Sequence, residues 1–388
     1  MNIKNKNLYY IGGVVRDEIL GHESFDIDLT YDGDAIEFAK TIKDVEIVQI
    51  NEPFGTVRIR FGGDEIDMAS TRSEIYPQKG HLPVIDKIGC SLKEDVLRRD
   101  FTINAMAKST LTGEIIDYTG GLEDIKNKKL RVLHDESFID DPTRILRALK
   151  FAVRFGFEPD ENTAKLQNDY LKNINYDMSY KRLKKELIET FNLNRRDAFE
   201  RFVNQGIYKL IAPQEFSLPD YDFSGLINKL TNFCHSELDS ESSKMCMNHK
   251  NIWIIYIGLL PEISSLPLTK AEKNIVEEYR KLKNNPLPQS LPAGDGSIDF
   301  SIYKAFKNIP IESVIMYSTI NHEVVEHYLN DLKDIELEIS GDDLKELGIT
   351  PSEKYQECFD FVLSEKIRNP EITKADEIKL AKGFFAKN

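Results

Sequence analysis

The residue pattern of the chain changes once, near residue 140, and this change constrains the fold more than any single motif does. Up to about residue 135, short runs rich in β-branched and aromatic residues alternate with glycine-containing turns. From about Asp141 onward, apolar residues recur with the spacing of an amphipathic helix. The pattern therefore predicts an α+β protein, with a small α/β head followed by a long all-helical part.

Four runs in the first part are predicted to be strands because β-type residues are bounded there by turn signals. The paired glycines Gly12-Gly13 and Gly62-Gly63 lie beside these runs. The predicted strands are Leu8–Ile11, Phe25–Leu29, Thr56–Phe61 and Glu65–Ala69.

The second part carries the start and stop signals of helices. Asp141 is predicted to be an N-cap with Pro142 at the first helical position, and Gly156 is predicted to end that helix. Residues 178–192 are predicted to form another amphipathic helix, capped by Ser179. Two polar segments are predicted to lie outside helices, residues 234–249 as a loop or insertion and residues 284–298 as a linker.

The composition argues against a membrane protein, an exported protein and a protein that coats nucleic acid over a broad surface. No apolar run approaches the roughly 20 residues that a membrane span needs, and the N-terminus lacks the apolar core of a signal peptide. The net charge is −14, which disfavours an extended basic surface. Four cysteines form no CxxC pair, so we expect reduced thiols in a cytoplasmic protein: Cys90, Cys234, Cys246 and Cys358.

A paired-glycine turn and three acidic residues mark a candidate site in the head. Gly12-Gly13 follows a predicted strand and opens a helix, where backbone N–H groups favour phosphate. Asp26 and Asp28 alternate along the next strand and project from one face, and Asp67 lies on a later strand. Each feature alone also fits an ordinary turn or surface strand. Together they predict two Mg²⁺ ions, one activating a 3′-hydroxyl and one stabilising the leaving pyrophosphate.

The order of the motifs resembles the class II tRNA nucleotidyltransferase and bacterial poly(A) polymerase superfamily. The glycine turn with Arg16 and the Asp26-x-Asp28 pair are similar to its motif A. Further resemblance is found in Arg98-Arg99-Asp100-Phe101-Thr102-Ile103-Asn104 (motif B), in Gly113–Asp124 (the link from head to neck), in Asp140-Asp141-Pro142-Thr143-Arg144-Ile145-Leu146-Arg147 (the base-reading motif) and in Ile339–Gly348 (the C-terminal domain).

This resemblance implies a nucleotidyltransferase-type head with a mixed sheet, followed by an all-helical neck, body and tail. It implies template-independent addition of CCA to the 3′ end of tRNA from CTP and ATP, with Mg²⁺ as the cofactor. No stable protein partner is predicted. The expected regions are residues 1–139 (head), 140–200 (neck, which reads the nucleotide base), 201–330 (body) and 331–388 (tail, which binds tRNA).

The same resemblance implies roles for individual residues. Asp26, Asp28 and Asp67 are expected to be the catalytic, metal-binding carboxylates. Lys150 stands where the family more often has arginine, so it keeps the charge but loses the planar fork. The expected nucleotide-binding residues are Gly12, Gly13, Arg16, Arg98, Arg99, Asp100, Asn104, Asp141, Arg144, Arg147 and Lys150.

Asp141 and Arg144 give a chemical reason for selecting CTP and ATP. Cytosine and adenine both present an amine donor beside a ring-nitrogen acceptor, whereas guanine and uracil present the opposite order. A carboxylate accepts from the amine and a guanidinium donates to the ring nitrogen, so one Asp/Arg pair suits both bases. Asp141 also suits a helix N-cap, and Arg144 could pair with it on the same turn.

Several alternatives remain open from the sequence. A poly(A) polymerase or a partial enzyme that adds only CC or only A shares the motifs, and residues 76–90 are long enough to supply the flexible loop that CC-adding relatives lack. An HD-type phosphohydrolase is disfavoured because His134-Asp135 has no matching ligand set, and His322–His327 is one residue too long for a zinc-protease motif. A catalytically dead RNA-binding protein is disfavoured by the intact acidic residues.

Overall fold

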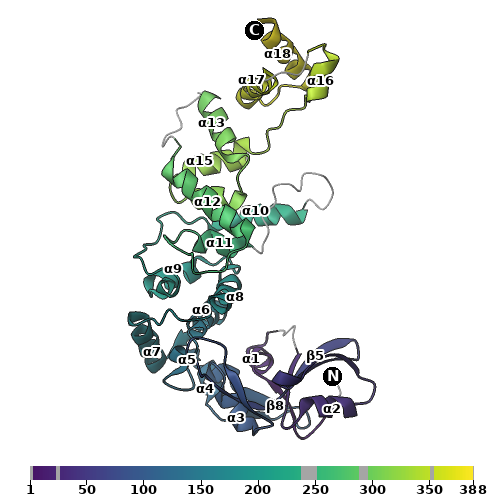
Figure 1. Cartoon of the computed structure of the whole chain (residues 1–388), viewed down its shortest axis with the longest axis vertical. Helices are drawn as coiled ribbons and strands as arrows, with labels where there is room; N and C mark the ends of the chain where they lie inside the picture. The colour runs from purple at the N-terminus through teal and green to yellow at the C-terminus, as the bar shows by residue number, and fades with distance from the viewer. Residues whose placement is uncertain (1–2, 23–26, 237–250, 288–295, 350–353, 388) are drawn as a thin grey trace. The chain divides into compact units, whose positions relative to one another are not determined.

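The computed structural model of the chain describes residues 3–22, 27–236, 251–287, 296–349 and 354–387. The chain divides into two compact units, each with its own core. The first is Met1–Phe216 together with Ser264–Pro267, and the second is Ser217–Ile263 together with Leu268–Asn388. Strands occupy the N-terminal part of the first unit, coloured purple to blue, and helices follow (Figure 1).

A seven-stranded mixed sheet forms the centre of the head, as predicted. Its strand order is β3-β4-β5-β2-β1-β8-β9. β2 and β5 are parallel, and the other neighbouring strands are antiparallel. The strands are β1 (Leu8–Ile11), β2 (Ile27–Tyr31), β3 (Glu46–Asn51), β4 (Thr56–Phe61), β5 (Asp64–Ser70), β8 (Met106–Ser109) and β9 (Ile115–Asp117).

Alternation along strand β4 gives this part of the sheet one apolar face and one polar face. In β4, Val57 and Ile59 are buried, whereas Arg58 and Arg60 between and beyond them are exposed. The buried side chains pack in one core with residues of helix α2 (Ala35–Thr41). The opposite face of β4 and β5 therefore remains polar and is available for a site, whereas β1 and β8 also contribute to a second apolar cluster with α3 (Leu92–Leu97).

A two-stranded hairpin and short helices complete the head. The hairpin joins β6 (Arg72–Ile75) to β7 (Val84–Ile88). The prediction of a loop over residues 76–90 was therefore too wide, because residues 84–88 pair as a strand and only residues 76–83 connect the two strands. The helical segments are α1 (Gly13–Leu20), α3 (Leu92–Leu97), η2 (Thr102–Asn104), α4 (Gly121–Lys126) and α5 (Ser137–Asp140), and short β10 (Lys129–Leu130) pairs with β11 (Glu158–Pro159).

The helices of the neck pack on buried apolar faces. The predicted stop at Gly156 is confirmed by its left-handed conformation (φ 69°) at the end of α6. Pro142, however, occupies the N-cap position rather than the first helical position of that helix. Ser179 precedes α8 as predicted, but its side chain makes no capping hydrogen bond. These helices are α6 (Thr143–Phe155), α7 (Glu161–Lys172), α8 (Tyr180–Phe191) and α9 (Arg196–Asn204), followed by η3 (Ile207–Leu210).

In the described residues of the second unit, all regular elements are helices, joined by turns and loops. Residues 237–250, most of the predicted insertion, and residues 288–295 of the predicted linker lie outside the described residues. Residues 296–298 begin helix α13, so the predicted linker was too long. The helices are α10 (Ser224–Ser236), α11 (Ile252–Ile257), α12 (Lys270–Asn284), α13 (Gly296–Phe306), α14 (Ile311–Tyr317), α15 (His322–His327), η6 (Tyr328–Leu332), α16 (Gly341–Glu346), α17 (Lys354–Arg368) and α18 (Lys374–Lys387).

Membrane-spanning helices and clusters of three metal-binding side chains are absent from the described residues. None of the helices there has both the length and the apolar character needed to span a membrane. His327 hydrogen-bonds Asp299 and Asp331 at 3.0 and 2.9 Å. Over the described ranges, no three His, Cys, Asp or Glu side chains form a candidate metal-ligand group.

Candidate active site

Two of the three predicted carboxylates lie side by side on the polar face of the sheet. Asp28 on β2 and Asp67 on β5 are direct partners in the parallel register, so their side chains emerge on the same face of adjacent strands. Asp26 lies outside the described residues, and its place in a ligand set stays a prediction. Arg58 on β4 holds Asp67 through two hydrogen bonds of 2.7 and 2.9 Å.

The chemistry of this donor set fits Mg²⁺. The ion is bound in proteins through one or two carboxylates, with water and substrate phosphates completing its octahedral shell. Asp28 and Asp67 supply two such carboxylates, and both are exposed to solvent. The arrangement therefore suits an ion that arrives with a triphosphate better than a closed, all-protein metal cage.

The glycine turn brings the backbone close to an arginine of motif B. Gly12 has a φ of 72°, and a Cβ at this position would lie 2.8 Å from Nη1 of Arg99. Only glycine combines this backbone conformation with so close an approach. The turn leads from β1 directly into α1, and both glycines line the same cavity as Asp28.

Arg16 has a largely structural environment. It is 5% exposed, pairs with Asp17 and donates to Oδ1 of Asn104 at 2.6 Å. Its guanidinium lies 5.1 and 4.7 Å from the ring centres of Phe151 and Phe155. Burial lowers the pKa of Arg16, although the pairing with Asp17 opposes this shift. The residue therefore ties the glycine turn to motif B and to the neck helix α6.

The two arginines of motif B share one buried carboxylate. Asp95 accepts from Nη2 of Arg98 at 2.8 Å and from Nη2 of Arg99 at 3.1 Å. Burial alone would raise the pKa of Asp95, but the two guanidinium groups outweigh it and the pKa is lowered. Arg98 also pairs with Glu74 at 3.0 Å. Nε of Arg99 is buried and makes no hydrogen bond within the described part of the chain.

Asp100 connects the head to the neck. Its carboxylate receives Nε and Nη2 of Arg147 at 2.7 and 2.6 Å, and the amide of Asn104 at 3.0 Å. Burial would raise the pKa of Asp100, but Arg147 and Asn104 outweigh it and lower the pKa to about 2. The nearby carboxylate of Asp100 in turn raises the pKa of Arg147. This ion pair therefore remains charged at neutral pH.

The predicted base-reading residues lie at the start of α6. Oδ1 of Asp141 accepts from the backbone N–H of Thr143 at 3.1 Å, and its Oδ2 pairs with Arg182 of α8. Arg144 donates to Ser137 at 2.6 Å and to the carbonyl of Arg98 at 3.2 Å. Asp141, just before the N-cap residue Pro142, therefore bonds the first turn of α6 and Arg182, while Arg144 is held by partners other than that carboxylate.

Lys150 is enclosed by acidic side chains. It is 8% exposed, and its Nζ lies 2.7 Å from Glu186 and 2.5 Å from Glu189. Glu186 also pairs with Arg147 at 3.3 Å. The charge of Lys150 is thus already compensated by two carboxylates. A direct contact between Lys150 and a nucleotide stays a prediction.

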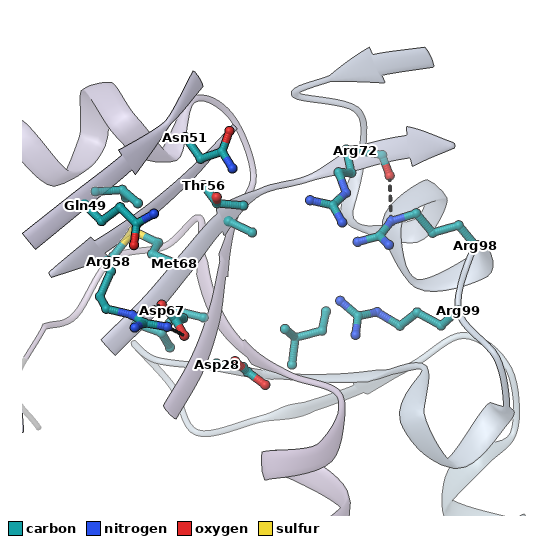
Figure 2. A pocket seen from close by; sticks show the side chains of 14 residues that line it. Asp28, Gln49, Asn51, Thr56, Arg58, Asp67, Met68, Arg72, Arg98 and Arg99 are labelled. Atoms are coloured by element: carbon teal, nitrogen blue, oxygen red, sulfur yellow. Dashed lines mark hydrogen bonds and ion pairs between the residues drawn. The ribbon is translucent and has the colours of Figure 1, made fainter. Parts of the chain in front are cut away.

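Most of the predicted residues line one cavity of about 760 Å³ between head and neck. Asp67 and Arg98 instead line a second cavity of about 490 Å³, and Asp28 and Arg99 line both. Figure 2 shows the second cavity, with Asp28 and Asp67 near one another and Arg98 and Arg99 across from them. The predicted residues on the first cavity are Gly12, Gly13, Arg16, Asp28, Arg99, Asp100, Asn104, Asp141, Arg144, Arg147 and Lys150.

The structure adds residues that were not among the predicted site. Arg182 and Glu186 of α8 line the first cavity, where they pair with Asp141 and Arg147. Arg58 and Arg72 line the second cavity. Alternation along β4 could have put Arg58 on the face of Asp67, whereas no local signal marks Arg72.

The connection between β6 and β7 is bound to the neck. Gly80 donates its N–H to the carbonyl of Asp140 and accepts from the N–H of Ser179, each at 3.0 Å. His81 lies 3.0 Å from Asp177, and its carbonyl accepts from Arg182 at 3.3 Å. The hairpin therefore contacts the neck at two places, beside Asp141 and at the start of α8.

Residues 8–131 match the family described as the Poly A polymerase head domain. The chain is 32% identical to the A-adding tRNA nucleotidyltransferase of Geobacter sulfurreducens over 96% of its length, but it spans only 44% of that relative. It is 27% identical to the A-adding tRNA nucleotidyltransferase of Halalkalibacterium halodurans, covering 98% of the chain and 89% of the relative.

The fold also has a solved counterpart. The structure of a CCA-adding enzyme in an apo form superposes with a TM-score of 0.78, covering 98% of this chain and 92% of that one. The two sequences are 24% identical. This likeness establishes the α+β head and the helical remainder as a known architecture.

Proposed function

Because the chain belongs to the tRNA nucleotidyltransferase and poly(A) polymerase superfamily, we propose that it transfers nucleotides from CTP and ATP to the 3′ end of tRNA without a template. The observation that carries this proposal is the cavity between head and neck. It joins Asp141 and Arg144 at the neck to the glycine turn and Asp28 at the sheet. A nucleoside triphosphate has its base and its phosphates in the same order.

The chain's own residues have distinct tasks in this proposal. Asp28 and Asp67, with Asp26 as the predicted third acid, would hold the metal. When bound, Mg²⁺ supplies the positive charge that activates the 3′-hydroxyl and stabilises the leaving pyrophosphate, and we propose two ions. The backbone at Gly12-Gly13 approaches the phosphates. Arg99 contributes a guanidinium that binds phosphate oxygens.

The neck supplies the choice of base. The carboxylate of Asp141 accepts from the exocyclic amine of cytosine or adenine, and Arg144 donates to the ring nitrogen. Arg182 already neutralises Asp141, and Arg98 and Ser137 orient Arg144. These groups are therefore preorganised, and a nucleotide exchanges only some of their present partners.

We propose synthesis of the complete CCA end, as the sequence predicts. Addition of the terminal A alone is a second candidate. The observation in its favour is that both of the relatives above, which align over nearly the whole chain, are named A-adding. Either activity would take place in the cytoplasm, where its tRNA substrate is found.

One assay tests the proposal and separates these candidates. The protein is incubated with Mg²⁺ and tRNA transcripts that lack CCA, end in CC or are complete, and each nucleoside triphosphate is offered separately. Incorporation of two C and then one A supports complete CCA synthesis. Addition of A to CC ends only would identify the A-adding candidate, and long A tails would identify a poly(A) polymerase. No incorporation on any transcript would contradict the proposed function.

A further inference from the structure

The second cavity adjoins the nucleotide cavity, and the two share Asp28 and Arg99. Figure 2 shows its two sides: Gln49, Asn51 and Thr56 lie on strands of the sheet, and Arg72, Arg98 and Arg99 lie across the space from them. The carboxylates of Asp28 and Asp67 are near its base. The cavity therefore lies next to the proposed reaction centre but outside the proposed path of the nucleotide.

The geometry of phosphoryl transfer indicates what enters this cavity. The attacking oxygen and the leaving oxygen lie roughly in line through the reacting phosphorus. If the triphosphate extends through the nucleotide cavity to Asp28, the attacking 3′-hydroxyl must approach from the other side. The second cavity, of about 490 Å³, meets the nucleotide cavity at Asp28 and Arg99 and extends past Asp67. It therefore suits the terminal nucleotide of the RNA acceptor.

The sheet side of this cavity carries two exposed amides. Gln49 on edge strand β3 pairs in register with Arg58, and Asn51 ends the same strand. Asn51 stands at the N-cap position of the short helix η1 (Glu52–Phe54), yet its side chain makes no capping hydrogen bond. Asparagine is a favoured capping residue. Here its amide does not cap the helix and lines the cavity instead.

We propose that Gln49 and Asn51 bind the base of the terminal nucleotide of the RNA acceptor and so position its 3′-hydroxyl beside Asp28. Each side-chain amide offers one acceptor and two N–H donors, which match the alternating groups on the edge of a base. The arginine side, where Arg72 and Arg98 lie, suits the phosphate that links this nucleotide to the RNA. This inference rests on the proposed function and names the residues for its second substrate.

The experiment removes either the amides or the base. A short acceptor-stem RNA ending in CC is compared with the same RNA whose terminal cytosine is absent but whose ribose keeps its 3′-hydroxyl. The KM for each RNA and for ATP is measured with the unmodified protein and with a double variant carrying Gln49→Ala and Asn51→Ala. Val48→Ala is the matched control, because Val48 is an exposed residue on the same strand that does not line the cavity.

The expected result is a double-mutant cycle with coupling between amides and base. In the unmodified protein, loss of the base raises the KM for RNA, and this ratio falls about tenfold in the double variant, the effect of one to two hydrogen bonds. The KM for ATP stays unchanged, and Val48→Ala behaves as the unmodified protein does. An unchanged base-loss ratio in the double variant would overturn the proposal. Failure of the unmodified protein to extend any RNA would instead overturn the proposed function.

Discussion

The carboxylates of the sheet and those along the boundary between head and neck differ in burial. The side chains of Asp67 and its partner Arg58 are 53% and 44% exposed. The side chains of Asp100 and Asp141 are 9% and 7% exposed, although each also pairs with an arginine. Carboxylate–arginine pairs therefore occur in two surroundings in this site: exposed to water on the sheet, and largely buried between head and neck.

This difference separates two kinds of work. An exposed ion pair contributes little to stability, so a carboxylate such as Asp67 can exchange its arginine for another cation at small cost. A buried pair cannot lose one partner without leaving an uncompensated charge. We infer that the sheet provides the exchangeable groups of the reaction, while Asp100 and Arg147 maintain the shape of the cavity.

The strongest test of this comparison is Asp28→Asn. The amide keeps the shape of the side chain but removes the charge that we propose to bind a metal, so the rate of nucleotide addition should fall on the order of 10³-fold. The free energy of unfolding should change by no more than about 0.5 kcal/mol, because the position is exposed. Single-turnover extension and urea unfolding measure the two quantities. Retention of near-normal extension would remove Asp28 from the catalytic set.

The second test breaks one pair of each kind. Arg147→Met leaves the Asp100 carboxylate buried and unpaired, and should lower the free energy of unfolding by about 3 kcal/mol. The matched variant Arg58→Met breaks the exposed pair with Asp67 and should cost less than about 1 kcal/mol. Urea unfolding of both variants compares them directly. Equal losses would show that burial does not distinguish the two regions.

The third test uses pH. The pKa of Asp100 in the folded chain is about 2, below its ordinary value of 3.8. Its charge therefore stabilises the folded chain above pH 4, and this contribution disappears as the pH falls toward 2, by about 2 kcal/mol in total. The stability difference between the unmodified protein and Asp100→Asn should shrink over this window. A difference that stays constant from pH 5 to pH 2 would contradict the assignment.

The smallest expected effect concerns the choice of base. Asp141→Asn keeps an oxygen that can accept from the N–H of Thr143, but it can also present an N–H donor to guanine. The preference for ATP over GTP should therefore fall about tenfold. The free energy of unfolding should also fall, because the substitution removes the buried ion pair with Arg182. Competition between the two nucleotides in the extension assay measures the preference. An unchanged preference would indicate that Asp141 only holds Thr143 and Arg182 in place and does not contact the base.

The sequence alone predicted much of this molecule because several of its signals are local. Strands β1 and β4 lie where alternation and turn residues placed them, and the end of α6 follows from Gly156. The pairing of Asp28 with Asp67 was a hypothesis about separate strands, and the parallel register supports it. The start of α6 was misplaced by one residue, because Pro142 takes the cap position while Asp141 bonds the next N–H.

Only the tertiary structure decided which partner each charged side chain has. The family resemblance marked Arg147 and Lys150 as candidates to bind a nucleotide, but their ion pairs with Asp100, Glu186 and Glu189 join segments far apart in the chain. The division of the site into two cavities that meet at Asp28 and Arg99 depends in the same way on packing. Periodicity reports which face of an element is buried, whereas the partner across that face is set by the whole fold.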